Sequence, residues 1–357
     1  MKKTCFIVAL LWMAQWSVAE VSSSVNLPYY YATANGKSGN ELRLALYEVI
    51  KGHNSLGYKN IGTIMQWSDT KDADGEHILD IYTNCEFTCD GPVTWIGSGA
   101  VGAGLNREHT VPQSWFSENE PMKSDVFHVY PTDTKANNNR SSDLYGECAN
   151  GSSSSSAKCS ETGKKGTSDW TAGSSSYTYN GQTYVAATSY SGTVYEPIDE
   201  YKGDLARSYF YMAIRYASGE GTLNCENWSG SAFGTDLNGL GAYTAEVLLK
   251  WHRLDPVSEK ELIRNEVIYG NPDYNKSTSK QGNRNPFIDY PELVEYIWGD
   301  MQEVPVTISA LVTTYNNPFE ALDNTNAGGK IRKVLRDNQL YLQIDDRWFT
   351  VTGQRVQ

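Results

Sequence analysis

Apolar residues recur at intervals of three and four along several stretches of this chain, and this spacing predicts amphipathic helices. The predicted helices cover residues 40–52, 204–217, 242–251, 258–267 and 291–298. Asn40 is a suitable N-cap for the first of them. Ser258 and Glu261 form a capping-box pattern at the start of the fourth, and Gly299 is a suitable stop for the last.

Alternation of apolar and polar residues, the period of a β-strand, predominates after residue 303. It predicts strands over residues 304–308, 339–344 and 347–351, with a turn-rich linker over 324–329. Earlier in the chain, strands are predicted over 78–83, 105–111 and 125–130, and a helix from Pro131 through Arg140. We therefore predict an α+β fold. It has a mainly helical domain over residues 20–303 and a small β-rich tail over 304–357.

The first residues have the pattern of a signal peptide. Lys2 and Lys3 form a charged start, an apolar run extends from Phe6 to Ala14, and Ala19 is a small residue suited to cleavage. The apolar run is too short for a permanent membrane anchor. We therefore expect residues 1–19 to be removed and the product to be secreted, periplasmic or attached to the cell surface.

Export permits disulfides, and the cysteines allow more than one arrangement. Without Cys5 in the signal segment, the close pairs are Cys85 with Cys89 and Cys148 with Cys159. This spacing predicts two small disulfide loops and leaves Cys225 unpaired, although spacing alone does not decide the connectivity. The segment from Cys148 to about residue 176 is rich in Ser, Gly and Thr and is predicted to be a surface loop.

The formal net charge of the 357-residue chain is −12. Nucleic-acid binding depends largely on neutralising phosphates, so this charge argues mildly against a nucleic-acid partner. A local cationic groove on an acidic protein is still compatible with one.

One segment carries a pattern suited to phosphodiester hydrolysis. Glu108 directly precedes His109, and an asparagine-rich run from Thr134 to Arg140 follows further along the chain. Such hydrolysis needs a base for the attacking water and compensation for the charge that grows on the phosphoryl oxygens. A neutral imidazole suits the first task, and a Mg²⁺ ion held by a few protein oxygens suits the second.

The predicted elements make this geometry feasible but impose one difficulty. Asn137 and Arg140 are three apart on a predicted helix and share a face. Asn137 can offer its amide oxygen to a metal, and Arg140 can hold a phosphate or a nearby carboxylate. Glu108 and His109, in contrast, start on opposite faces of a strand, so we expect a bend or bulge to bring them together.

The segments 107–116, 125–131 and 135–141 together resemble the endonuclease I family, which are exported bacterial nucleases with a ββα-metal finger. Stretches at 202–207, 249–258 and 281–289 are similar too, so the resemblance spans residues 40–299. It implies an endonuclease that acts on DNA, and often RNA, with little sequence preference and leaves 5′-phosphate ends.

Carried onto the matching residues, the resemblance makes His109 the general base and Glu108 and Asn137 the metal ligands. The implied cofactor is Mg²⁺, with Mn²⁺ or Ca²⁺ as alternatives. Many relatives have a histidine where this chain has Phe127, so any role of that histidine is absent here. Asn138 and Asn139 adjoin Asn137 and would allow the ligand assignment to shift by one position. We assign Asn137 because it shares a helical face with Arg140.

Further residues have weaker assignments. Arg140, Arg207 and Arg284 are candidates for phosphate contacts, and a structural ion pair is the equal alternative for each. His128 is expected to pack beside the site and to orient another group through its ring N–H. We expect the protein to be a monomer.

The tail resembles, through residues 341–344 and 349–354, C-terminal β segments of exported Bacteroidetes-type proteins. Those segments act in secretion or surface attachment, and a simple packing appendage is the alternative.

A second function fits part of the sequence. A surface-anchored binding module on an inactive nuclease scaffold would agree with the acidic charge and the serine-rich segment. The presence of Glu108, His109 and Asn137 together argues against it, because a scaffold without catalysis has no need of them.

Overall fold

The computed structural model describes residues 21–97, 99–154, 156–313 and 315, together with the backbone of the strands at 331–336, 339–344 and 347–350. The predicted signal peptide at 1–19, the predicted linker at 324–329 and residues 351–354 lie outside the described residues.

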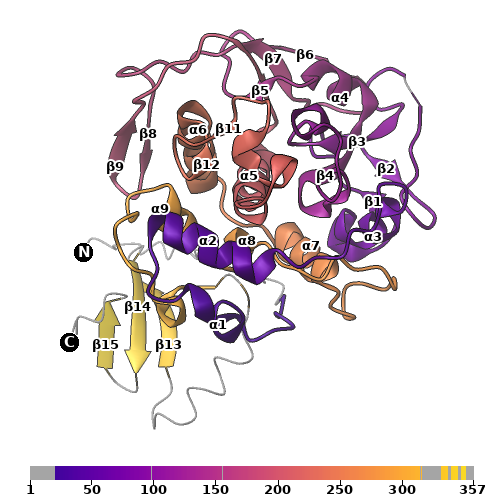
Figure 1. The fold of residues 1–357 in the computed structure, drawn as a ribbon. Coiled ribbons are helices and arrows are strands. Elements are labelled where there is room, and N and C mark those ends of the chain that lie inside the picture. Colours follow the sequence, from indigo (N-terminus) through magenta and orange to yellow (C-terminus); the bar gives the residue numbers. More distant parts are fainter. Residues whose placement is uncertain are drawn as a thin grey trace, which may run out of the picture.

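The structure contains both helices and strands, so the predicted α+β class is confirmed (Figure 1). The α-helices are α1 (Leu27–Tyr30), α2 (Gly39–Ile50), α3 (Ile61–Ser68), α4 (Thr134–Arg140), α5 (Lys202–Arg215), α6 (Ala242–Leu254), α7 (Glu259–Tyr269), α8 (Pro286–Asp289) and α9 (Leu293–Ile297). Within the described part of the chain, no helix combines the length and the apolarity needed to cross a lipid bilayer.

The strands form several small sheets rather than one large one. They are β1 (His77–Ile78), β2 (Phe87–Thr88), β3 (Leu105–His109), β4 (Val129–Asp133), β5 (Leu144–Tyr145), β6 (Ser152–Ser153), β7 (Lys164–Thr167), β8 (Ser176–Tyr179), β9 (Gln182–Val185), β10 (Thr193–Glu196), β11 (Phe233–Gly234), β12 (Gly239–Leu240), β13 (Ile331–Arg336), β14 (Gln339–Ile344) and β15 (Arg347–Thr350). The largest sheet has the order β5-β10-β7-β6, and β13, β14 and β15 form a separate antiparallel sheet.

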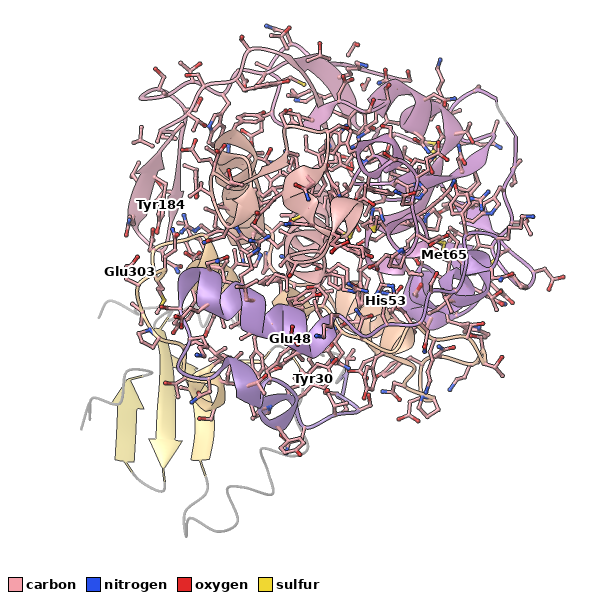
Figure 2. All side chains as sticks on the ribbon, viewed as in Figure 1. Tyr30, Glu48, His53, Met65, Tyr184 and Glu303 are labelled. Atoms are coloured by element: carbon pink, nitrogen blue, oxygen red, sulfur yellow. A yellow bond between two sulfur atoms is a disulfide. The ribbon has the colours of Figure 1, made fainter. Side chains whose placement is uncertain are left out.

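Helix α5 is the centre of the core. Every residue from Gly203 to Arg215 is buried, and α2, α6 and α8 pack around the helix (Figure 1). The apolar pattern predicts a helix with one buried side, whereas its polar residues are also inside. A helix buried all round belongs to the interior of a large domain, and side chains fill the space around it (Figure 2).

Local signals predict the helix ends with mixed success. Ser258 and Glu261 form the predicted capping box of α7, which ends at Gly270 with a left-handed φ of 104°. The predicted N-cap Asn40 is wrong, because α2 begins at Gly39 and Ser38 occupies the cap position.

The segment from β3 to α4 forms the frame of the site. Strands β3 and β4 pair antiparallel in an unbroken register from Leu105 with Asp133 to His109 with Val129, and α4 follows β4 directly. The predicted strand at 125–130 begins later than expected, because residues 126–128 form a 3-10 turn. Helix α4 begins at Thr134, where the Asp133 carboxylate accepts from the backbone N–H groups of Lys135 and Ala136.

The disulfide differs from the predicted pairing. Cys85 bonds to Cys159, whereas Cys89, Cys148 and Cys225 are free. The bond closes a segment of 74 residues that contains β3, β4 and α4. Close spacing in the sequence therefore misidentified the partners, because the fold brings two distant loops together. The serine-rich stretch from Cys148 to about residue 176 is also more ordered than predicted, since it carries β6 and β7.

The start of the predicted tail belongs to the packed body. Residues 304–308 form no strand, and Val306, Ile308 and Leu311 are buried in the core. The Tyr315 hydroxyl donates to the carbonyl oxygen of Leu262 in α7, over 3.2 Å. The strands predicted at 339–344 and 347–351 correspond to β14 and β15.

Candidate active site

An open pocket of about 440 Å³ lies beside β3 and α4. Glu108, His109, Asn137 and Arg140 all line it, together with Tyr58, Asn106, Arg107, Pro112, Gln113, Ser114, Glu118, Ser141 and Ser142. The structure thus brings four of the predicted site residues into one cavity. Asn138 and Asn139 do not line it, which supports the choice of Asn137.

The Glu108 carboxylate is held on the α4 side of β3. Its Oε1 lies 3.1 Å from Nη1 of Arg140 and accepts a 2.7 Å hydrogen bond from the Tyr82 hydroxyl. Burial raises the pKa of Glu108 to about 7, although the Arg140 guanidinium and the Tyr82 hydroxyl both act to lower it. A cation in the pocket would favour the ionised carboxylate.

His109 is held by the backbone of a neighbouring turn. Its Nε2 lies 2.9 Å from the carbonyl oxygen of Lys123, in the 3-10 turn Met122–Ser124. A carbonyl oxygen only accepts, so Nε2 carries the proton and Nδ1 of the neutral ring has the free lone pair. Burial and the nearby His128 lower the pKa of His109 to about 3, so the ring is neutral near pH 7.

His128 contacts the same 3-10 turn as His109. Its Nε2 lies 2.7 Å from the carbonyl oxygen of Met122, and its ring centroid is 5.5 Å from that of His109. The two imidazoles therefore bind consecutive carbonyl groups of a single turn. The predicted orienting role of His128 is compatible with this contact, through a backbone turn rather than through a metal ligand.

Asn137 connects α4 to the backbone of β3. Its Nδ2 donates to the carbonyl oxygen of Arg107 over 3.1 Å. Among the described residues, no hydrogen bond engages the side-chain oxygen of Asn137. Since this side chain lines the pocket, its oxygen is available to a cation there.

The predicted bend or bulge in β3 is absent, since the ladder with β4 is regular through Glu108 and His109. The two side chains leave the strand toward different elements. Glu108 reaches Arg140 on α4, whereas His109 reaches Lys123 in the turn. Both residues nevertheless line the same pocket.

The donor atoms around this pocket suit a hard cation that keeps water ligands. Over the residues the structure describes, no group of three or more His, Cys, Asp or Glu side chains could hold a metal ion. Mg²⁺ does not need such a group, since it is commonly bound through one or two protein oxygens and several waters. The Glu108 carboxylate and the Asn137 amide oxygen meet that requirement.

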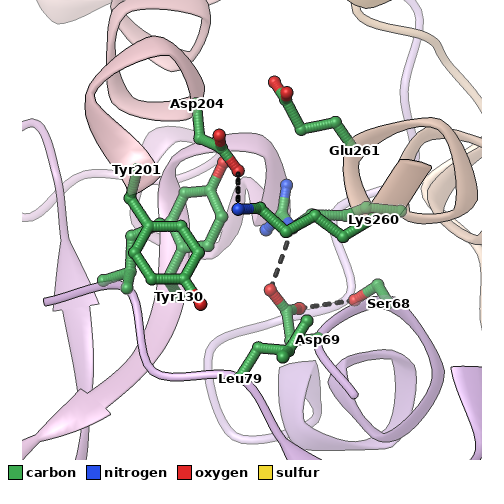
Figure 3. A pocket seen from close by; sticks show the side chains of 10 residues that line it. Ser68, Asp69, Leu79, Tyr130, Tyr201, Asp204, Lys260 and Glu261 are labelled. Atoms are coloured by element: carbon green, nitrogen blue, oxygen red, sulfur yellow. Dashed lines mark hydrogen bonds and ion pairs between the residues drawn. The ribbon is translucent and has the colours of Figure 1, made fainter. Parts of the chain in front are cut away.

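Arg207 and Arg284 lie outside the pocket, in buried ion pairs. Arg207 binds Glu261 through Nε and Nη2, at 2.5 and 2.7 Å. Glu261 lines a second, smaller cavity together with Asp204 and Lys260 (Figure 3). This cavity has a volume of about 20 Å³, which holds roughly one water molecule. The structure therefore gives Arg207 the ion-pair role that was the alternative to phosphate binding.

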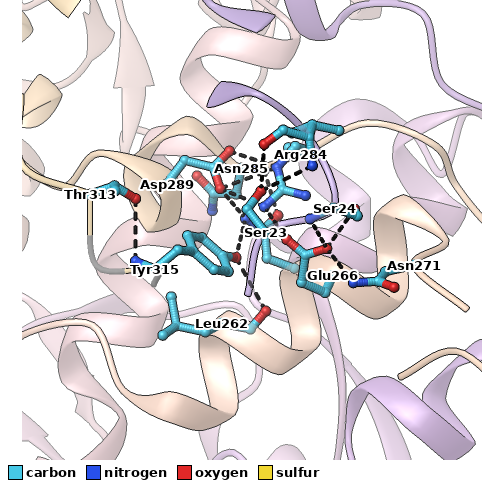
Figure 4. A network of polar contacts seen from close by, with 12 residues as sticks. Ser23, Ser24, Leu262, Glu266, Asn271, Arg284, Asn285, Asp289, Thr313 and Tyr315 are labelled. Atoms are coloured by element: carbon cyan, nitrogen blue, oxygen red, sulfur yellow. Dashed lines mark hydrogen bonds and ion pairs between the residues drawn. The ribbon is translucent and has the colours of Figure 1, made fainter. Parts of the chain in front are cut away.

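Arg284 lies in a polar network that joins distant parts of the chain (Figure 4). Its Nη2 lies 2.6 Å from Glu266 and 2.7 Å from Asp289, while Ser24 donates to Glu266 over 2.7 Å. Neither guanidinium is exposed to solvent. Arg284, like Arg207, is thus placed as a structural cation.

Sequence reasoning did not identify three contributors to this site. The Tyr58 ring lies beside the His109 ring, tilted by 32° with centroids 5.4 Å apart, Tyr82 binds Glu108, and Lys123 supplies a backbone carbonyl. The two tyrosines lie in the chain well before the Glu-His pair and carry no motif of their own. A backbone carbonyl leaves no signature in residue type, so only the fold could reveal it.

Comparison with known proteins shows the class of protein to which this chain belongs. The chain is 34% identical over 292 residues to an extracellular ribonuclease of Bacillus amyloliquefaciens, which covers 80% of this chain and 83% of that protein. An extracellular ribonuclease of Bacillus subtilis (strain 168) is 31% identical over 275 residues, with 75% and 78% covered. The protein is accordingly a nuclease.

The family can be stated more closely. The sequence profile described as endonuclease I matches residues 38–292, which include the whole pocket lining. The chain therefore belongs to the endonuclease I family, as the resemblance of its motifs predicted.

Proposed function

We propose that this protein is a secreted, Mg²⁺-dependent endonuclease that hydrolyses DNA and RNA with little sequence preference and leaves 5′-phosphate ends. The observation that carries the proposal is the convergence of Glu108, His109 and Asn137 on one open pocket. The binding-module alternative is less favoured, because the chain belongs to a nuclease family and keeps a neutral imidazole in the same pocket as the oxygens of Glu108 and Asn137.

His109 is the general base of this proposal. Its Nδ1 takes a proton from the attacking water as the water oxygen bonds to phosphorus. The bond from phosphorus to the 3′ oxygen then breaks, and the departing oxygen takes a proton from solvent water, which yields a 3′-hydroxyl and a 5′-phosphate. The Lys123 carbonyl supports this role, because it holds the tautomer that leaves Nδ1 unprotonated.

Glu108 and Asn137 are proposed to hold Mg²⁺. When bound, the ion supplies positive charge that compensates the developing charge on the phosphoryl and leaving oxygens. Arg140 would act on this site indirectly, by fixing the Glu108 carboxylate at 3.1 Å. Its other N–H groups donate to the carbonyl oxygens of His109 and Thr110, at 3.3 and 2.6 Å, so it also holds the end of β3.

Substrate and location follow from chemistry and relatives. A site that binds phosphate carries no sequence information, so low specificity is expected. The Bacillus relatives are called extracellular ribonucleases, which supports RNA as a substrate alongside DNA. Together with the predicted signal peptide at 1–19, those names support secretion.

The test uses purified protein that lacks residues 1–19, with supercoiled plasmid and a long RNA as substrates and Mg²⁺ in the buffer. We expect nicking and linearisation of the plasmid and degradation of the RNA. His109→Ala should lower the rate roughly 10²- to 10⁴-fold. His77→Ala is the matched control, since that histidine is exposed and paired with Asp74, and it should cleave like the wild type.

Each component of the proposal has its own contradicting result. Undiminished cleavage by His109→Ala would remove the base assignment. Full activity after exhaustive chelation with EDTA would remove the metal. A shifted but uncut plasmid band with the wild-type protein would favour the binding module.

A further inference from the structure

One cation at the pocket has no carboxylate partner. Two carboxylates line the pocket, and each has its own cation: Glu108 pairs with Arg140 at 3.1 Å, and Glu118 with Lys123 at 2.6 Å. Arg107 also lines the pocket, yet it forms no ion pair within the described part of the chain. An unpaired guanidinium at the site of an acidic protein indicates a place for an external anion.

The Arg107 guanidinium lies close to two aromatic rings. Its central carbon lies 3.9 Å from the centroid of Tyr58 and 4.6 Å from that of Trp95. One N–H group donates to the carbonyl oxygen of Tyr58 over 3.0 Å, and Nε is buried without a partner. No other hydrogen bond of its side chain occurs among the described residues. This pair of ring contacts, here called the clamp, restrains the guanidinium and leaves terminal N–H groups free to donate to a phosphate.

Arg107 lies beside the general base at a defined spacing. It is two residues from His109 on β3, so both side chains leave the same face of the strand. The Tyr58 ring contacts both of them. Two residues along a strand cover about 6.6 Å, which is comparable to the distance between consecutive phosphates of an extended nucleic-acid strand.

We propose that Arg107, clamped by Tyr58 and Trp95, binds the phosphate adjacent to the scissile phosphate. This inference rests on the proposed function, because it takes the bond beside His109 as the one that is cut. The ligand is a phosphodiester of either DNA or RNA, and Arg107 contacts neither sugar nor base. The site thus prefers a chain with a charged neighbouring linkage to an isolated phosphodiester.

The test compares short oligonucleotides that contain one reference phosphodiester. In the first, all other linkages are neutral methylphosphonates. In two further oligonucleotides, a single natural phosphate is restored next to the reference bond, on its 5′ or its 3′ side. Cleavage at the reference bond is measured by product mass. We expect the wild-type cleavage rate to rise roughly 10- to 100-fold with one of the two restored phosphates. This is the increase expected when one hydrogen bond to a charged group is gained.

Arg107→Met should lose this gain, so that it cleaves the neutral-flanked oligonucleotide and those with a restored phosphate at equal rates. Arg107→Lys keeps the charge without the planar fork and should retain part of the gain. Lys276→Met is the matched control, because Lys276 is an exposed cation that binds backbone carbonyls of residues 272 and 273. It should keep the full gain.

Three results would overturn the proposal: no gain by the wild type on either side, an equal gain by Arg107→Met, or an equal loss by this variant on every oligonucleotide. The last would mean that Arg107 acts only through the fold. Absence of wild-type cleavage on natural DNA and RNA would instead contradict the proposed function.

If the wild type cleaves neither natural DNA nor natural RNA, a binding measurement still tests the phosphate contact of Arg107. In a His109→Ala background, adding Arg107→Met should reduce the slope of log Kd against log salt by about 0.7 for single-stranded DNA. An unchanged slope would contradict the phosphate contact.

Discussion

The Arg140 guanidinium on α4 lies 3.1 Å from the Glu108 carboxylate on β3, and both side chains are almost completely buried. This pair joins the helix of the ββα segment to the strand that carries the candidate metal ligand Glu108 and the proposed base His109. It also explains how Glu108 remains beside the pocket although it leaves β3 in a different direction from His109. The first prediction concerns this pair.

Arg140→Met should destabilise the protein and inactivate it. The substitution leaves the Glu108 carboxylate buried without its cation, which costs about 3–5 kcal/mol. Denaturant unfolding measures this loss. The double variant Glu108→Gln/Arg140→Met should regain much of the stability but no activity, since it lacks the carboxylate. An Arg140→Met protein of wild-type stability would instead favour a role for Arg140 as a phosphate ligand alone.

Mg²⁺ should raise the thermal stability of the folded protein without any substrate. A ligand that binds only the folded state adds about 2.7 kcal/mol at roughly 100 times its Kd. Glu108→Gln and Asn137→Ala should each lose most of the rise in Tm, and EDTA should reverse it in the wild type. Asn138→Ala is the matched control, as this exposed neighbour does not line the pocket. Equal shifts in Asn137→Ala and Asn138→Ala would contradict the ligand assignment.

Thiol titration distinguishes the disulfide of the structure from the predicted close pairs. Protein without residues 1–19 should show three free thiols in denaturant, those of Cys89, Cys148 and Cys225, whereas the two predicted loops would leave only Cys225. Cys85→Ser should lower the free energy of unfolding by about 2–4 kcal/mol, because the bond constrains a long loop in the unfolded chain. Cys89→Ser should cost much less, and a comparable loss from both would argue against the Cys85–Cys159 bond.

Stability should fall in acid partly through His252. Burial and the nearby Arg207 lower the pKa of this ring from 6.5 to about 3, so the folded state keeps it neutral while the unfolded state protonates it below about pH 6.5. The contribution of His252 to the free energy of unfolding is therefore complete above that pH. It is lost as the pH falls toward 3, by about 1.4 kcal/mol per pH unit. His252→Gln should show a correspondingly smaller loss between pH 6 and pH 4 in denaturant unfolding.

The control for the pH experiment is Val247→Ala, which shortens a buried side chain of the same helix without removing a titratable group. It should lower stability by a similar amount at every pH. If His252→Gln loses stability with pH as steeply as the wild type does, the ring does not contribute in the way described.

Residue pattern alone determined the α+β class, the positions of α2, α5, α6, α7 and α9, and the segments that carry the site. These depend on local periodicity, on caps such as Ser258 and Glu261, and on contiguous motifs, all of which are written in short stretches of chain. The assignment to a nuclease family came from the same contiguous motifs.

Tertiary structure decided which distant groups meet. Cys85 pairs with Cys159 rather than with Cys89, and Arg207 and Arg284 turn inward to carboxylates. His109 takes its tautomer from a carbonyl group of another loop, and Arg107 remains without an ion partner at the pocket. Such choices depend on the packing of remote segments and on the low polarity of the interior, where each buried charge must find a partner. No short stretch of sequence contains that information.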